Sequence, residues 1–131
     1  MPGRLVPLCI CLALVTGCGS GNPGNASVER DVERGLAEIQ SGHDRKTVQA
    51  KLTAVIARLR SDKPDSDSKR RAKALAIAGF EAKLTSVRAE REFYENDSGQ
   101  VKEATIDAAR ADTFRKRAEE LLRAAKRALE D

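Results

Sequence analysis

Apolar residues recur along most of the chain at the spacing of one face of an α-helix. The clearest case covers residues 44–62, where the apolar positions are Val48, Leu52, Val55, Ile56 and Leu59. Residues three and four apart lie on one side of a helix, so this stripe predicts an amphipathic helix. Asp44 can cap its first turn, and Pro64 stops it.

A shorter stripe precedes this helix. The apolar positions Val28, Val32, Leu36 and Ile39 predict a helix over residues 28–41. Ser27 is its expected N-cap and Gly42 its expected end. Gly35, inside this helix, weakens it by up to about 1 kcal/mol relative to alanine. We therefore expect a helix that is stable only when it docks on the rest of the chain.

Two longer helices follow. The first is expected over residues 68–95. It is apolar on nearly every side between residues 72 and 80, which indicates burial between neighbours, and it is amphipathic from residue 84 onward. A turn at residues 96–99 (Asn-Asp-Ser-Gly) separates it from a helix that extends to about Leu129. Asp97 and Gln100 can form a capping box at the start of this last helix.

These patterns predict an all-α fold, a bundle of three to four helices with a long antiparallel helical hairpin and packing of the coiled-coil kind. No stretch shows the alternation of β-branched residues that a sheet needs. Aromatic residues make up only 3% of the chain and charged residues 34%. This composition is typical of helices that pack through small side chains.

Short turns force consecutive helices to run antiparallel, which indicates which residues face one another. In the long hairpin, Phe80 is expected opposite Phe114, and Leu84 opposite Ala111, so that large side chains face small ones. The helix over residues 44–62 is expected to place Val48 near Phe80. Phe80 would then contact two helices.

The same pairing of helices predicts that the end of the long hairpin protrudes as a tip. The two shorter helices should reach only to about residue 82, which leaves residues 84–95 and 100–111 uncovered over about 18 Å. Phe93 and Tyr94 lie on this tip, and exposed aromatic residues on a rigid arm are candidates for binding a protein partner. The alternative is that both rings simply clasp Val101 at the start of the last helix.

The first 17 residues resemble a secretory signal. Arg4 and the amino terminus provide a positive start, and residues 5–15 (LVPLCICLALV) form an apolar core. This core is well short of the roughly 20 residues that a membrane-spanning helix needs. The segment is therefore expected to be removed from the mature protein.

The end of this segment, Val15-Thr16-Gly17-Cys18, resembles the lipobox of bacterial lipoproteins. The resemblance implies that Cys18 is joined to diacylglycerol after cleavage of the bond before it, and that acyl chains anchor the protein to a membrane of the cell envelope. The absence of an acidic residue beside Cys18 resembles the pattern sent to the outer membrane, facing the periplasm, in diderm bacteria. The alternatives are ordinary secretion after cleavage near Gly19 and an uncleaved anchor.

The chain then divides into residues 1–17 as the signal peptide, 18–27 as the lipidated cysteine with a flexible tether, and 28–131 as the helical domain. Cys9 and Cys11 leave with the signal, so Cys18 is the single thiol that remains, and no disulfide can form within one molecule. The 114 residues from Cys18 on have a formal charge of +3, because only Arg4 is lost from the total of +4. This mild excess does not indicate a nucleic-acid-binding protein.

Candidate chemistry is sparse. His43 is the only histidine, and the adjacent Asp44 makes a His-Asp pair that is more typical of a capping turn than of a catalytic site. Asp65 and Asp67 lack the remaining ligands of an EF-hand. The sequence therefore predicts no catalytic residue, no metal site and no cofactor.

The densest positive cluster has four members: Lys69, Arg70, Arg71 and Lys73. It is a candidate site for anionic lipid or cell-wall polymer. The favoured interpretation is a membrane-anchored, non-enzymatic envelope lipoprotein that binds a protein partner as adaptor, assembly factor or inhibitor. The long amphipathic helices also allow a homodimer, which would cover the tip.

Overall fold

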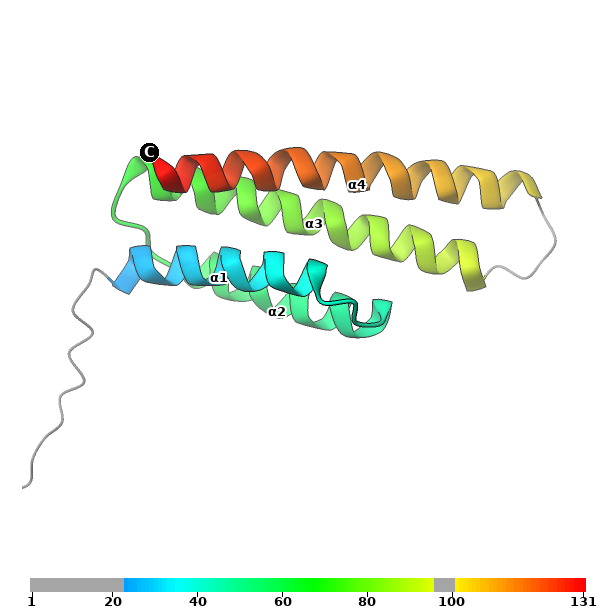
Figure 1. The fold of residues 1–131 in the computed structure, drawn as a ribbon, viewed down its shortest axis with the longest axis horizontal. Coiled ribbons are helices and arrows are strands. Elements are labelled where there is room, and N and C mark those ends of the chain that lie inside the picture. The colour runs from blue at the N-terminus through cyan, green and yellow to red at the C-terminus, as the bar shows by residue number, and fades with distance from the viewer. Residues whose placement is uncertain (1–22, 96–100) are drawn as a thin grey trace, which may run out of the picture.

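The computed structural model describes residues 23–95 and 101–131, with side chains for residues 28–95 and 104–131. The described residues form four helices, α1 (Pro23–Gln40), α2 (Arg45–Ser61), α3 (Asp67–Glu95) and α4 (Val101–Glu130), and contain no strand. Figure 1 shows the α1–α2 pair packed along one side of the long α3–α4 hairpin. The predicted all-α bundle is confirmed.

The helix boundaries agree closely with the sequence pattern for α2, α3 and α4. Asp44 is the N-cap of α2, and its carboxylate accepts a hydrogen bond of 3.1 Å from the Thr47 amide. Gly42 has a φ of 72°, a left-handed conformation that glycine adopts at little cost, and it follows the end of α1 as predicted.

The start of α1 differs from the prediction. The helix begins at Pro23, five residues before the predicted Val28, so Ser27 lies inside the helix and is not its cap. Proline is well suited to a first helical turn, because its fixed φ is helical and the amide hydrogen it lacks would have no partner there. The last five residues of the predicted tether are therefore helical.

Several predicted features lie outside the described residues: the signal segment, the lipobox with Cys18, the turn at residues 96–99 and the capping box of Asp97 and Gln100. None of the described helices has the length and apolar character needed to cross a membrane.

The long helix α3 buries two separate faces. One face carries the large side chains of Phe80, Leu84 and Val87, which belong to the same buried cluster as the apolar residues of α1 and α2. The other face carries small residues spaced by seven (Ala72, Gly79 and Ser86), all of them buried.

This small-residue face of α3 packs against α4. A Cβ atom on Gly79 would lie only 2.8 Å from Leu122 Cγ, and Ser86 Oγ donates a hydrogen bond of 3.0 Å to the Ala111 carbonyl oxygen. A side-chain hydroxyl can reach a backbone carbonyl of the facing helix only when the two helices lie close together. Ala118 and Ala125, one and two heptads after Ala111, are also buried.

The predicted pairing of the hairpin is therefore wrong in detail. Ser86, and not Leu84, meets Ala111, and the segment at Gly79 faces Leu122 rather than the region of Phe114. The prediction assumed that the large residues of α3 point at α4. Instead, Phe80 lies over Gly35 of α1, and Leu84 lines a surface pocket together with Ile56 of α2.

The pairing of α2 with α3 is also shifted toward the tip. Arg45 at the start of α2 contacts Glu90 of α3, well beyond residue 82 where the two shorter helices were expected to end. The reason lies in the connection after α2, where Asp62 has an extended backbone (φ −65°, ψ 140°). An extended connection displaces α2 along α3, whereas the prediction assumed a tight turn at Pro64.

Phe80 holds α1 to the bundle. Its ring is fully buried and lies over Gly35 of α1, where an added Cβ atom would be only 2.2 Å from Phe80 Cζ. Because Gly35 has no side chain, α1 can approach the ring closely. The glycine that weakens α1 in isolation is what allows it to dock.

Substitution Gly35→Ala should destabilise the protein, although alanine is the better helix former. We expect a loss of about 1–3 kcal/mol in the free energy of unfolding, because the rigid ring of Phe80 cannot move out of the way. Urea denaturation followed by circular dichroism measures this loss. In a Phe80→Leu background the same substitution should cost clearly less; an equal cost in both backgrounds would contradict the role of the ring.

Candidate functional site

Helix α2 carries only positive charges. Residues 45–61 contain five basic residues and no acidic one. Its cations reach acidic residues on both neighbouring helices: Lys51 and Arg58 contact Glu38 and Asp31 of α1 at 3.3 and 3.4 Å. On the other side, Arg60 pairs with Glu81 of α3, and Arg45 contacts Glu90 of α3. Charge therefore helps to position α2 between α1 and α3, and it brings Arg45 to the far part of α3.

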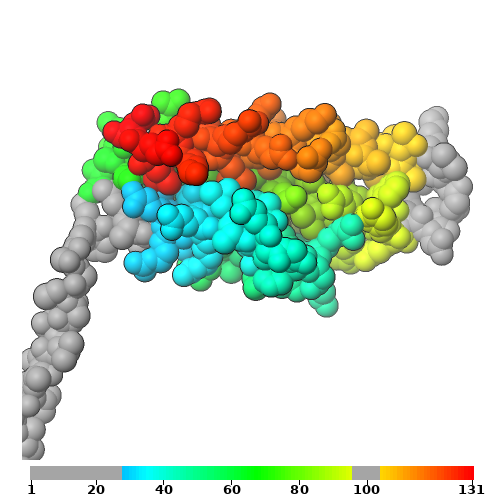
Figure 2. Space-filling view, in the orientation of Figure 1, coloured from blue at the N-terminus to red at the C-terminus, as the bar shows by residue number. Residues whose placement is uncertain are grey.

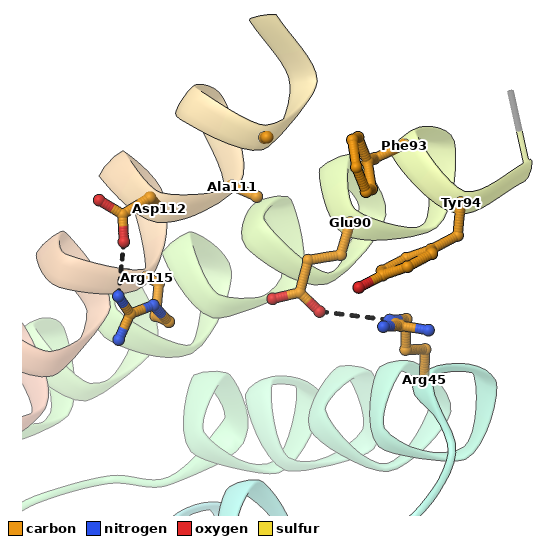
Figure 3. A pocket seen from close by; sticks show the side chains of 8 residues that line it. Arg45, Glu90, Phe93, Tyr94, Ala111, Asp112 and Arg115 are labelled. Atoms are coloured by element: carbon orange, nitrogen blue, oxygen red, sulfur yellow. Dashed lines mark hydrogen bonds and ion pairs between the residues drawn. The ribbon is translucent and has the colours of Figure 1, made fainter. Parts of the chain in front are cut away.

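A surface cleft forms where the start of α2 meets the far parts of α3 and α4. We call it the tip cleft. Its volume is about 390 Å³ and its lining residues are Arg45, Glu90, Phe93, Tyr94, Ala108, Ala111, Asp112 and Arg115. Figure 3 shows the aromatic and charged side chains converging on it from three helices.

Tyr94 is exposed but held in place. The exposed fraction of Tyr94 is 66%, yet the guanidinium carbon of Arg45 lies 4.4 Å from the centre of its ring. Arg45 Nε in turn donates a hydrogen bond of 3.2 Å to Glu90, which fixes the arginine over the ring. Phe93 supports the other side of the tyrosine through an edge-to-face contact, with ring centres 5.0 Å apart.

The opposite wall of the tip cleft belongs to α4. Lys116 Nζ lies 2.8 Å from the Asp112 carboxylate, and Arg115 also contacts it. Hydrogen bonds from Lys116, and secondly from Arg115, hold the pKa of Asp112 below its usual range. The charged lining residues therefore comprise two cations (Arg45, Arg115) and two anions (Glu90, Asp112), and the cleft is neutral overall.

The structure brings together the two predicted partner-binding residues, Phe93 and Tyr94, but corrects their setting. They do not lie on a bare arm, because Arg45 of α2 covers one face of Tyr94. The far ends of α3 and α4 still extend past the α1–α2 pair, as Figure 2 shows. Ile106, in the first turns of α4, is 58% exposed. The contact predicted with Val101 lies outside the described side chains.

The predicted anionic-ligand cluster is largely engaged within the chain. Lys69 pairs with Glu29, and Arg70 pairs with Asp67. Lys73 Nζ donates hydrogen bonds to the carbonyl oxygens of Asp62 (2.6 Å) and Arg60 (3.2 Å) at the end of α2. Arg71 is exposed. Two of the four cations, Lys69 and Lys73, therefore link α3 to α1 and to α2, whereas the pair of Arg70 lies within α3.

The His43-Asp44 pair does not form a joint site. The Asp44 carboxylate accepts hydrogen bonds from Thr47, whereas His43 Nδ1 lies 2.6 Å from Glu38. Within the described residues, no cluster of three metal-ligating side chains occurs.

Sequence reasoning missed the acidic residues that α1 buries. Asp31 and Glu38 are 5% and 8% exposed. Their spacing of seven places them on one face of α1, beside the apolar stripe, and this spacing is the signal that could have identified them. The hydrogen bond from His43, and secondly the contacts with Lys51, hold the pKa of Glu38 below its usual range.

Comparison with known proteins finds no matching family model, no matching curated protein and no matching solved structure.

A double-mutant cycle tests the contact between Arg45 and Tyr94. The substitutions Arg45→Ala and Tyr94→Leu, made singly and together, should show a coupling of about 0.5–1 kcal/mol in the free energy of unfolding. Lys46→Ala, which removes the neighbouring exposed cation, should show no coupling with Tyr94→Leu. Equal coupling for both cations would indicate a general charge effect rather than stacking.

The Glu38 site predicts a pH dependence of stability. Because folding lowers the pKa of Glu38, its ionised form stabilises the fold above the pKa of an unfolded glutamate, and this contribution disappears as the pH falls through the folded pKa. Glu38→Gln should therefore be less stable than the parent at neutral pH and equal to it in acid. Urea denaturation at a series of pH values measures the difference, and a difference independent of pH would refute the assignment.

Proposed function

We propose that the chain is a non-enzymatic lipoprotein of the bacterial cell envelope, anchored through Cys18, that binds a protein partner at the tip cleft. The main support for binding at this site is the ring of Tyr94. It is two-thirds exposed, and Arg45 and Phe93 nevertheless hold it in place. Tyrosine and arginine are the residues most enriched among energetically dominant interface residues, and a ring that is already ordered loses little entropy on binding.

The neutral charge of the tip cleft indicates the kind of partner. Two cations and two anions line the cleft together with Phe93 and Tyr94, so an ion of either sign gains little there. A protein surface with an apolar or aromatic side chain at its centre and mixed charges around it fits this arrangement. The positive cluster at the start of α3 offers less to an anionic ligand, because Lys69, Arg70 and Lys73 already have partners.

The direction of the bundle supports an anchored adaptor. In Figure 1 the first described residues of α1 lie at one end of the bundle, whereas the end of α3 and the start of α4 lie at the other. Helix α3 has 29 residues, a length of about 43 Å at 1.5 Å per residue. Four residues separate Cys18 from Pro23. An anchor at Cys18 would thus hold one end near the membrane and present the tip cleft away from it.

The anchor is tested by the intact mass of the protein taken from the membrane fraction. We expect a chain that begins at Cys18 and carries two or three acyl chains, together with loss of these chains and of membrane association in a Cys18→Ala variant. An unmodified chain, or one that retains residues 1–17, would refute the anchor while leaving the partner-binding proposal to its own test.

The partner site is tested by photo-crosslinking in intact cells. A photoreactive amino acid is placed at Tyr94, or at the exposed Arg127 near the other end of α4 as a matched control. We expect a discrete protein adduct from position 94 only, and its yield should persist in high salt, since the contact is mainly apolar. The same adducts from both positions, or none from position 94, would contradict the proposal.

A further inference from the structure

We propose that Asp62 and Asp31 form a carboxyl pair that holds one proton at the joint of α1, α2 and α3, and that release of this proton to water loosens α1 from the bundle. This pH-dependent loosening of α1 does not depend on the proposed partner or on the lipid anchor.

The backbone of Asp62 is clamped at the joint. Asp62 is the C-cap of α2, and its amide donates hydrogen bonds to the carbonyl oxygens of Arg58 (3.1 Å) and Leu59 (3.2 Å). Lys73 of α3 donates a hydrogen bond of 2.6 Å to the Asp62 carbonyl oxygen. With its backbone fixed from two helices, Asp62 cannot leave the joint without breaking the end of α2.

Asp62 is half-buried, and one oxygen of its carboxyl group is turned inward. Its Oδ2 atom is buried and, within the described part of the chain, has no hydrogen-bond partner. An ionised carboxylate with a buried oxygen that accepts no hydrogen bond is costly, because it loses its water without replacement. A proton on Asp62 removes that charge and makes the carboxyl a hydrogen-bond donor.

The facing group is another carboxylate. Asp31 of α1 is 5% exposed and acts electrostatically on Asp62. Arg58 lies one helical turn before Asp62, and its Nε is 3.4 Å from Asp31 Oδ1, which places the end of α2 against this part of α1. Asp31 is buried and Asp62 is half-buried. Two neighbouring carboxylates that are partly shielded from water do not readily ionise together, so the pair favours retention of one proton.

The cations around the two carboxyl groups do not cancel the tendency of the pair to retain one proton. The charged groups that face it are Arg34 of α1, Arg58 of α2 and Lys73 of α3. Burial, and secondly the negative charge of Asp31, raise the pKa of Asp62, whereas Lys73 and Arg58 lower it by less. Both arginines are about half exposed, and both contact Asp31 rather than Asp62.

The direction in which stability changes with pH follows from the change in the pKa of Asp62 on folding. Because folding raises the pKa of Asp62, its contribution to stability is complete below the pKa of an unfolded aspartate and is lost as the pH rises through the folded value. This is opposite to the effect of Glu38, on the same face of α1. Since Asp31 lies on α1 and Asp62 on the clamped end of α2, repulsion after proton release acts between these two helices.

The proton is observed directly by carbon-detected NMR titration of the carboxyl groups in the full-length chain. We expect the Asp62 resonance to titrate above the ordinary aspartate value of about 3.9, and its midpoint to fall in an Asp31→Asn variant. Glu33→Gln, which removes one exposed negative charge from α1, should leave the midpoint in place. A midpoint at or below the ordinary value, or one that does not respond to Asp31→Asn, would overturn the proposal.

The loosening of α1 is measured by amide hydrogen exchange. Above the Asp62 midpoint, protection of the α1 amides should be several-fold greater in Asp62→Asn than in the parent protein, and below the midpoint the two should agree. Glu33→Gln should match the parent at both pH values. Equal protection in Asp62→Asn and the parent at both pH values would refute the coupling to α1. Should Asp62→Asn fail to fold, the titration of the unsubstituted chain still decides whether the proton is present.

Discussion

The close packing of α3 against α4 through small residues is the constraint on which the rest of the structure depends. Gly79 leaves no room for a Cβ atom beside Leu122, and Ser86 donates a hydrogen bond to a backbone carbonyl of the facing helix. Because Gly79 and Ser86 turn toward α4, the ring of Phe80 projects in another direction and meets Gly35 of α1. The long hairpin thereby becomes the support on which the two shorter helices assemble.

The two shorter helices are held on this support by different interactions. Helix α1 docks through the ring of Phe80, which fits over Gly35 because that residue has no side chain. Helix α2 contributes Leu52, Val55 and Leu59 to the core, and its positive charges pair with acidic residues of α1 and α3. The extended connection at Asp62 places α2 far enough along α3 for Arg45 to reach Tyr94, and so the tip cleft is a consequence of the way α2 packs.

The sequence was sufficient for the helices but not for their register. The stripe from Val48 to Leu59 identified the buried face of α2 correctly, since spacing along one helix is a local property. It indicated that residues 72–80 are buried between neighbours, but not which face of α3 meets α4, because alanine, glycine and serine give little hydrophobic signal. Phe80 was therefore matched with Phe114, although Gly79 and Ser86 mark the true contact with α4.

The candidate site was predicted only in part for a similar reason. Phe93 and Tyr94 were identified because the expected pairing of the helices placed two aromatic residues on a protruding tip. The role of Arg45 depends on the displacement of α2 along α3, which follows from the extended connection at Asp62 and from pairs between distant residues. Buried acidic residues such as Asp31 were not identified, because charged residues in the sequence were assumed to lie at the surface.

Nuclear Overhauser effects between side chains show which residues of α3 meet α4 and which meet α1. The account predicts strong effects between the Gly79 α-protons and the Leu122 methyl groups, and between the Phe80 ring and the Gly35 α-protons. Strong effects between the rings of Phe80 and Phe114, without those from Gly79 to Leu122, would contradict it. They would place the Phe80 ring against α4 and not against Gly35 of α1.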